Sequence, residues 1–160
     1  MNDKKLQTIY RRWAREFSHD SQRPVYVVSG APGSGKSTYV RENATDQDLI
    51  LDMDALCCAI QGAVGLHQDH SVVLPAALAA REAIYEEIEN QTGEWKRAFI
   101  ITANPDRQKV SELVRRFSAE HIEMKASREE CKNRVVNDPA RKGEEERQCQ
   151  IVDNWFDNHT

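Results

Sequence analysis

The sequence predicts an α/β protein, a three-layer αβα sandwich on a mostly parallel sheet of about four to five strands. Two observations support this prediction. Short apolar runs that suit buried strands alternate along the chain with stretches whose apolar residues recur at helical spacing. The length of 160 residues also fits one domain of this class. Strands that alternate with helices pair in parallel through right-handed crossovers, which places helices on both faces of the sheet.

The individual elements follow from these patterns in order. Apolar runs predict strands at 25–29, 49–51, 98–102 and 121–124. Helical patterns predict three helices in the first part of the chain, at 37–43, 55–61 and 74–89. Three more are predicted further on: one after the turn at 104–106 that carries Val110 to Phe117, one from 127 to about 136, and a last helix that carries 151–156. Ser127 and Glu130 form a capping box that opens the helix from 127, and Pro139 follows its end.

Residues 1–24 are expected to form a leading segment in front of a main domain at 25–160. Helical spacing in this segment predicts an amphipathic helix, and Asp20 to Pro24 has the composition of a linker. The apolar residues that share one face of this helix are Leu6, Ile9, Tyr10, Trp13 and Phe17.

Composition limits the surroundings and the partners of the protein. With 22 basic and 26 acidic residues the net charge is -4, which gives no overall attraction to nucleic acid or to an anionic membrane. No apolar run approaches the length of a membrane span or of a signal-peptide core. Without such a run, no membrane partner is expected. The four cysteines form no CxxC pair, and a reducing cytoplasm is the expected location.

The segment after the first predicted strand satisfies the pattern GxxxxGK[ST]. It lies between an apolar run and a helix-compatible run, which is the strand–loop–helix context that the pattern requires. In such a loop, glycines allow successive backbone N–H groups to turn toward an anion, and the following helix adds its positive end. The residues of the loop are Gly30, Ala31, Pro32, Gly33, Ser34, Gly35, Lys36, Ser37 and Thr38.

This motif predicts the fold of a phosphate-loop (P-loop) NTPase that binds ATP, with GTP as an alternative, together with Mg²⁺. Lys36 is expected to reach the β- and γ-phosphates, and the hydroxyl of Ser37 is expected to ligate Mg²⁺. Thr38 is expected near the α-phosphate. A turn that merely joins a strand to a helix is the structural alternative.

Asp52 and Asp54 follow the second predicted strand, at the edge of the sheet where the phosphate loop is expected. A carboxylate there can take the proton of an acceptor hydroxyl or hold water on Mg²⁺. We assign the base role and acceptor contact to Asp54 and a supporting metal role to Asp52. The alternative for Asp54 is that it caps the next helix.

Arginines further along the chain are candidates for phosphate and acceptor contacts. Arg134 and Arg141 flank the break at Pro139, which predicts a lid near 137–143 that closes cations over the transferred phosphoryl group; a solvated charged loop is the alternative. Arg81 lies in a mostly apolar helical run and either contacts the acceptor or extends to water.

Two further polar groups have weaker assignments. Thr102 and Asn104 follow the third strand, where many phosphate-loop proteins place a metal-linked aspartate; here the first aspartate, Asp106, comes only after the turn. His67 and His70 lie in a predicted loop, and we interpret them as part of a polar substrate loop in preference to a metal site.

The loop from Gly30 to Thr38, followed by Asp52-Met53-Asp54, resembles the kinase domain of bacteriophage polynucleotide kinase and related small phosphate-loop kinases, including AAA-type ATPase and kinase proteins encoded by phages. The resemblance covers roughly 25–142. It implies that Asp54 is the general base and that the lid arginines are Arg134 and Arg141. The family usually has an arginine three residues after the base, where this sequence has Cys57.

The leading hypothesis is therefore a Mg²⁺-dependent kinase that transfers the γ-phosphoryl group of ATP to a hydroxyl. The expected acceptor is a nucleic-acid hydroxyl (a DNA or RNA 5′-hydroxyl or a hydroxymethylated base) or a nucleotide-like small molecule. The alternatives are an ATP-hydrolysing switch that acts through a protein partner, and a nucleotide-binding module without turnover.

Overall fold

The structure is a computed structural model that describes residues 22–62 and 69–159. The expected helix in the leading segment and His67 lie outside the described residues. Within the described part, no helix is both long enough and apolar enough to span a membrane.

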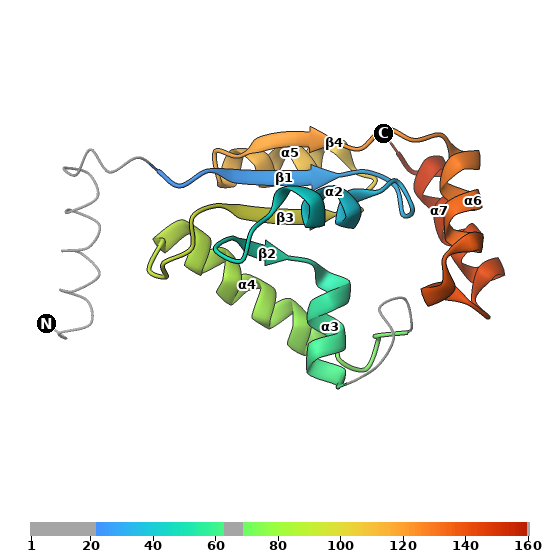
Figure 1. Ribbon diagram of the computed structural model, residues 1–160, viewed down its shortest axis with the longest axis horizontal. Coiled ribbons are helices and arrows are strands. Elements are labelled where there is room, and N and C mark those ends of the chain that lie inside the picture. Colours follow the sequence, from blue (N-terminus) through green and yellow to red (C-terminus); the bar gives the residue numbers. More distant parts are fainter. Residues whose placement is uncertain (1–21, 63–68, 160) are drawn as a thin grey trace, which may run out of the picture.

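A four-stranded parallel sheet forms the centre of the described part (Figure 1). Its strands are β1 (Val25–Ser29), β2 (Leu49–Leu51), β3 (Ala98–Thr102) and β4 (Glu120–Glu123), in the spatial order β2-β3-β1-β4. This confirms the predicted α/β class and the parallel pairing. β4 lies one residue earlier than the expected 121–124, because its pairing with β1 already begins at Glu120, opposite Tyr26.

The helices follow the predicted order, with small differences at their ends. They are α2 (Lys36–Asn43), α3 (Met53–Gln61), α4 (Leu74–Asn90), α5 (Arg107–Arg116), α6 (Arg128–Asn137), a 3₁₀ turn η1 (Pro139–Arg141) and α7 (Glu145–Asp157). The capping box of Ser127 and Glu130 opens α6 as expected. α3 starts at Met53 and not at 55, because Asp52 already caps it.

Alternation along the strands divides the core between the two faces of the sheet. On one face, Val27 and Ile100 pack with Ile88 of α4, Val110 of α5 and Phe117, which directly follows α5. On the other face, Val28 and Phe99 pack against Val40 of α2. These two layers of helices on either side of the strands complete the predicted sandwich (Figure 1).

α6 and α7 form a separate pair that stands at the carboxyl ends of the strands (Figure 1). Their shared core consists of Cys131, Val135, Val152 and Trp155, and it also encloses Ala31 of the phosphate loop. On the outside of the pair, Arg128 contacts Asp153 and Asp157 at 3.3 and 2.6 Å, and Lys132 contacts Asp153 at 2.6 Å. The pair is therefore joined by both an apolar core and a network of charges.

Gly33 is the point where the phosphate loop meets α6. A Cβ atom at this position would lie 2.8 Å from the carbonyl oxygen of Cys131 and 2.9 Å from Cγ1 of Val135. The residue also has φ of +78°, a conformation that favours glycine. Both the backbone conformation and the packing thus require a residue without a side chain.

We predict that Gly33→Ala destabilises the fold more than Gly143→Ala. Both glycines have positive φ, but nothing lies within 4 Å of a Cβ at Gly143. Gly143→Ala should cost about 1–2 kcal/mol for the left-handed conformation alone, and Gly33→Ala should add about 1–3 kcal/mol for the contact with α6. Denaturant unfolding measures both values, and equal losses would contradict the packing of the loop on α6.

Candidate active site

The phosphate loop connects β1 directly to α2, so the expected strand–loop–helix arrangement is present. Gly30, Gly33 and Gly35 all have positive φ, which turns the backbone around the amino end of α2. A Cβ at Gly30 would lie 2.7 Å from the carbonyl oxygen of Met124, so the loop also packs closely against the end of β4. Ser37 and Thr38 are exposed in the first turn of α2, where a bound phosphate would meet their hydroxyls.

Lys36 is the buried charge of the site, with 8% of the residue exposed. Its Nζ donates hydrogen bonds to the carbonyl oxygens of Gly30 at 2.8 Å and Ala31 at 2.7 Å. Burial lowers the pKa of Lys36 to about 8, while the nearby carboxylates of Asp52 and Asp54 act in the opposite direction. A polyphosphate in the loop would supply the negative charge that this ammonium group lacks in its immediate contacts.

Asp52 joins the phosphate loop to the start of α3. Its Oδ2 accepts a hydrogen bond from Oγ of Ser37 at 3.3 Å, and its Oδ1 accepts one from the backbone N–H of Asp54 at 3.0 Å. The second bond makes Asp52 the cap of α3. The structural alternative considered for Asp54, that it caps this helix, is therefore wrong: the extended backbone belongs to Asp52, and Asp54 lies exposed in the first helical turn.

The residues around Ser37 fit the expected Mg²⁺ ion. A hydroxyl and a carboxylate oxygen at 3.3 Å are the hard oxygen donors that Mg²⁺ prefers. Within the described residues, no group of three or more His, Cys, Asp or Glu side chains could hold a metal by itself. Mg²⁺ commonly takes one or two protein ligands and completes its shell with phosphate oxygens and water, so this small donor set suits it.

Both lid arginines lie near the loop, in different surroundings. Arg134 of α6 donates from Nη1 to the carbonyl oxygens of Ser34 at 3.2 Å and Gly33 at 3.4 Å. Arg141, in η1, is held by Asp138 at 3.0 Å and by the side chain of Gln148. Its positive charge is close enough to contribute to the lowered pKa of Lys36. The structure thus brings both arginines to the same end of the sheet as Lys36.

Arg81 and the polar residues after β3 have local contacts. Arg81 forms an ion pair with Glu82 at 2.9 Å and lies 5.5 Å from the ring centre of Tyr85 on the same helix, α4. Asn104 accepts a hydrogen bond from the backbone of Asp106, which in turn caps α5. The acceptor role of Arg81 stays a prediction.

Residues that the sequence patterns did not single out continue the site along α3. Cys58 and Gln61 follow Asp54 at helical spacing, four and seven positions later, and so share one face of the helix with it. His70 crosses to this face: its Nδ1 lies 2.7 Å from Oε1 of Gln61, and its Nε2 lies 3.9 Å from Sγ of Cys58. Helical spacing counted from Asp54 would have found Cys58 and Gln61.

Comparison with known proteins assigns the family. The profile of a family described as "AAA domain" matches residues 25–157. The chain belongs to this family. No curated protein matches the sequence. This assignment and the loop geometry identify a P-loop protein of the nucleotide-binding α/β class.

Two solved chains show how far the structural likeness extends. A chain from the Pnkp1/Rnl/Hen1 RNA repair complex has a TM-score of 0.56 and 15% identity, over 88% of this chain and 47% of that chain. Another structure of the Pnkp1/Rnl/Hen1 complex has a TM-score of 0.49 and 17% identity, over 73% of this chain and 40% of that chain. The chain thus spans less than half the length of these two solved chains, and at such identities the likeness concerns the fold. The closer resemblance to phage polynucleotide kinase stays a prediction.

The lowered pKa of Lys36 gives a test of nucleotide binding. Because a polyphosphate favours the ammonium form, ATP should raise this pKa, so binding above pH 8 should take up protons. The association constant should fall as pH rises through about 8, by up to about tenfold per pH unit. Calorimetry in buffers of different ionisation enthalpy measures the uptake. Lys36→Met should abolish it, and an unchanged uptake in that variant would exclude Lys36 as its source.

The two roles of Asp52 can be separated by a pair of variants. Asp52→Ser keeps a side-chain oxygen that can cap α3, so the free energy of unfolding should change by less than about 0.5 kcal/mol. It removes the carboxylate beside Ser37, so the Mg²⁺-dependent part of ATP affinity should fall about 10–100-fold. Asp52→Ala should show the same loss of affinity and cost about 1 kcal/mol more in stability. Unchanged Mg²⁺ dependence in both variants would rule out the metal role.

Proposed function

We propose that the protein is a Mg²⁺-dependent kinase that transfers the γ-phosphoryl group of ATP to an acceptor hydroxyl. The observation that supports this most directly is the hydrogen bond between Ser37 and Asp52, which brings the carboxylates at the start of α3 to the phosphate loop. A site for nucleotide phosphates and an exposed carboxylate, Asp54, thereby lie at the same edge of the sheet.

The donor nucleotide is held by the loop and the first turn of α2. The backbone N–H groups between Gly33 and Thr38 surround the β-phosphate, and Lys36 exchanges its carbonyl partners for phosphate oxygens. When Mg²⁺ is bound beside Ser37 and Asp52, it neutralises charge on the β- and γ-phosphates. These contacts are equally compatible with GTP.

Asp54 acts on the acceptor as general base. Its carboxylate takes the proton from the acceptor hydroxyl while the oxygen forms a bond to the γ-phosphorus, and the bond between that phosphorus and the bridging oxygen of ADP breaks. The products are the phosphorylated alcohol and ADP. The exposure of Asp54 and its position one residue inside α3 leave the carboxylate accessible to an incoming substrate.

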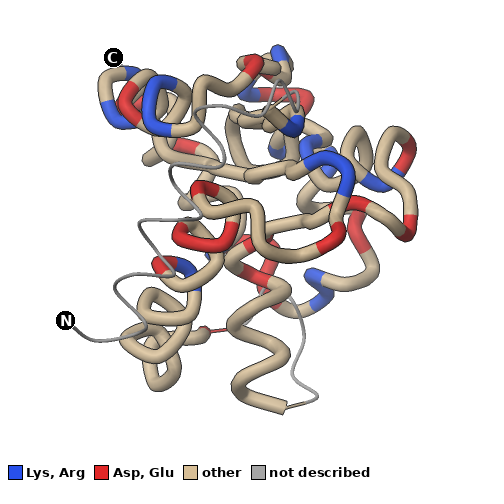
Figure 2. The backbone as a smooth tube through the Cα atoms, turned by 90° about the vertical axis from the view of Figure 1, so that its left-hand side faces the viewer, with Lys and Arg blue, Asp and Glu red and all other residues tan. Residues whose placement is uncertain are grey.

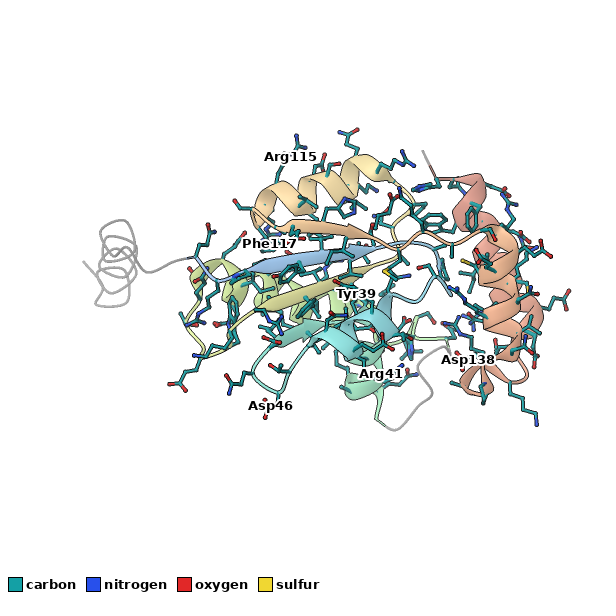
Figure 3. All side chains as sticks on the ribbon, turned by 45° about the horizontal axis from the view of Figure 1, so that its top comes forward. Tyr39, Arg41, Asp46, Arg115, Phe117 and Asp138 are labelled. Atoms are coloured by element: carbon teal, nitrogen blue, oxygen red, sulfur yellow. The ribbon has the colours of Figure 1, made fainter. Side chains whose placement is uncertain are left out.

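The segment 137–143 acts as a lid. Arg134 already lies on the loop, and Arg141 is held close to Lys36 by its ion pair with Asp138, which is labelled in Figure 3. A γ-phosphoryl group gives both guanidinium groups a stronger anionic partner as charge spreads over its oxygens in the transition state. Polynucleotide ends, hydroxymethylated bases and nucleotide-like small molecules are the acceptor classes that the sequence predicts.

Replacement of the base gives the decisive test of this function. Asp54→Asn should lower the rate of γ-phosphoryl transfer at least about 10²-fold, the usual contribution of a general base, while ATP affinity changes little. Asp46→Asn, in the exposed turn before β2, makes the same substitution far from the loop (Figure 3) and should keep full activity. Transfer of labelled phosphate to acceptor or to water is measured in both. Unimpaired transfer by Asp54→Asn would disprove the base assignment, and release to water only would favour a hydrolysing switch.

A further inference from the structure

We propose that the acceptor of this kinase is a small alcohol without a phosphate group, neutral or positively charged. This inference rests on the proposed kinase function and concerns the part of the site beside Asp54. It follows from the charge and the polarity of the surfaces that face this carboxylate, and it selects among the acceptor classes that the sequence predicts.

The stretch of chain around Asp54 carries neither lysine nor arginine. Between Arg41 and Arg81 the sequence contains neither lysine nor arginine, although lysine and arginine together number 22 in the whole chain. This stretch supplies β2, α3 and the first turns of α4. Figure 2 shows the positions of lysine and arginine in blue and of aspartate and glutamate in red along the backbone. The acidic residues of this stretch after β2 are Asp52, Asp54 and Asp69, whereas Glu42, Asp46 and Asp48 lie before β2.

Among the described residues, an amide, a thiol and an imidazole form a polar wall that continues from Asp54. Cys58 and Gln61 continue the face of α3 that begins with Asp54, and His70 packs across both. Oε1 of Gln61 accepts a hydrogen bond from Nδ1 of His70, and the other ring nitrogen faces the thiol of Cys58. This arrangement offers a hydroxyl-bearing ligand an amide, a thiol and an imidazole as hydrogen-bond partners, and neither a guanidinium nor an ammonium group.

The basic residues on other elements near this site either contact other groups of the protein or are assigned to the donor phosphates. Arg134 contacts the carbonyl groups of the phosphate loop, and Arg141 is paired with Asp138. Arg81 is paired with Glu82, and Arg147 of α7, whose charge contributes to the lowered pKa of Asp69, is paired with Glu144. Lys36 is committed to the donor phosphates. Beside Asp52 and Asp54, an acceptor phosphate would therefore meet two carboxylates, and among the described residues neither α3 nor 69–80 supplies a lysine or arginine.

Exposed apolar side chains continue this side of the molecule. Ile60 on α3 is 40% exposed, and Val72 and Leu74, at the start of α4, are 86% and 43% exposed. A polynucleotide needs clustered lysine and arginine along its phosphates, and this surface provides none. It suits a compact alcohol with an apolar face, and its acidic residues add attraction for an amino group.

A transfer assay with matched acceptors tests the proposal on the full chain. The series contains a nucleoside, its 3′-monophosphate and an oligonucleotide with a 5′-hydroxyl, and a sugar with its amino and phosphate derivatives. We expect kcat/KM for the uncharged and amino compounds to exceed that of their phosphate-bearing counterparts by at least about tenfold. The reason is the repulsion between an acceptor phosphate and the carboxylates of Asp52 and Asp54. A preference for the 3′-monophosphate or the oligonucleotide would overturn the proposal.

A charge-reversal pair locates the effect. Asp69→Arg places a cation beside His70 and should raise kcat/KM for phosphate-bearing acceptors relative to uncharged ones, by at least about threefold. Asp46→Arg makes the same change of charge in the turn before β2, at the amino-terminal end of the strands (Figure 3), and should leave the ratio unchanged. Equal shifts in the two variants, or no shift in Asp69→Arg, would overturn the placement of the acceptor against this wall.

The outcomes also separate this inference from the function on which it rests. Calorimetric ATP binding together with transfer to phosphate-bearing acceptors would keep the kinase and overturn only the acceptor class. ATP binding with release of phosphate to water, and no transfer to any acceptor, would overturn the kinase function and the acceptor proposal with it.

Discussion

The buried ammonium group of Lys36 is the charge on which the carboxyl edge of the sheet depends. It has carbonyl oxygens as direct partners, and burial lowers its pKa to about 8. The carboxylates at the start of α3 and the guanidinium group of Arg141 both influence it. Charged groups from elements far apart in the sequence thus act on the same ammonium group. An anionic ligand bound there would balance the positive charge of Lys36.

The geometry of the loop depends equally on contacts with its neighbours. Glycine at position 30 allows the backbone to approach the end of β4, and glycine at position 33 allows it to approach α6. The cap that Asp52 provides for α3 places the same carboxylate next to Ser37. Residues that stabilise helix ends and close contacts therefore also arrange the groups that face the nucleotide.

Much of this architecture could be predicted from the sequence because its signals are local. Apolar runs located the strands, and the phosphate loop carries its own spacing and flanking elements. Asp52 was harder to place, because two aspartates at one strand end are both good caps and only the backbone shows which one is extended. His70 contacts Gln61 and Cys58, which lie 9 and 12 positions earlier in the chain, and no sequence pattern encodes such a contact. Roles in catalysis, including those of Arg81 and Arg141, depend on a bound substrate and stay predictions.

The double attachment of α6 has a mechanical consequence. This helix packs on the phosphate loop at Gly33 and is joined to α7 by an apolar core and by the ion pairs of Arg128 and Lys132. Neither helix can swing alone without losing those contacts. Movement of one helix therefore carries the other with it, and it changes the contact of α6 with the phosphate loop at the same time.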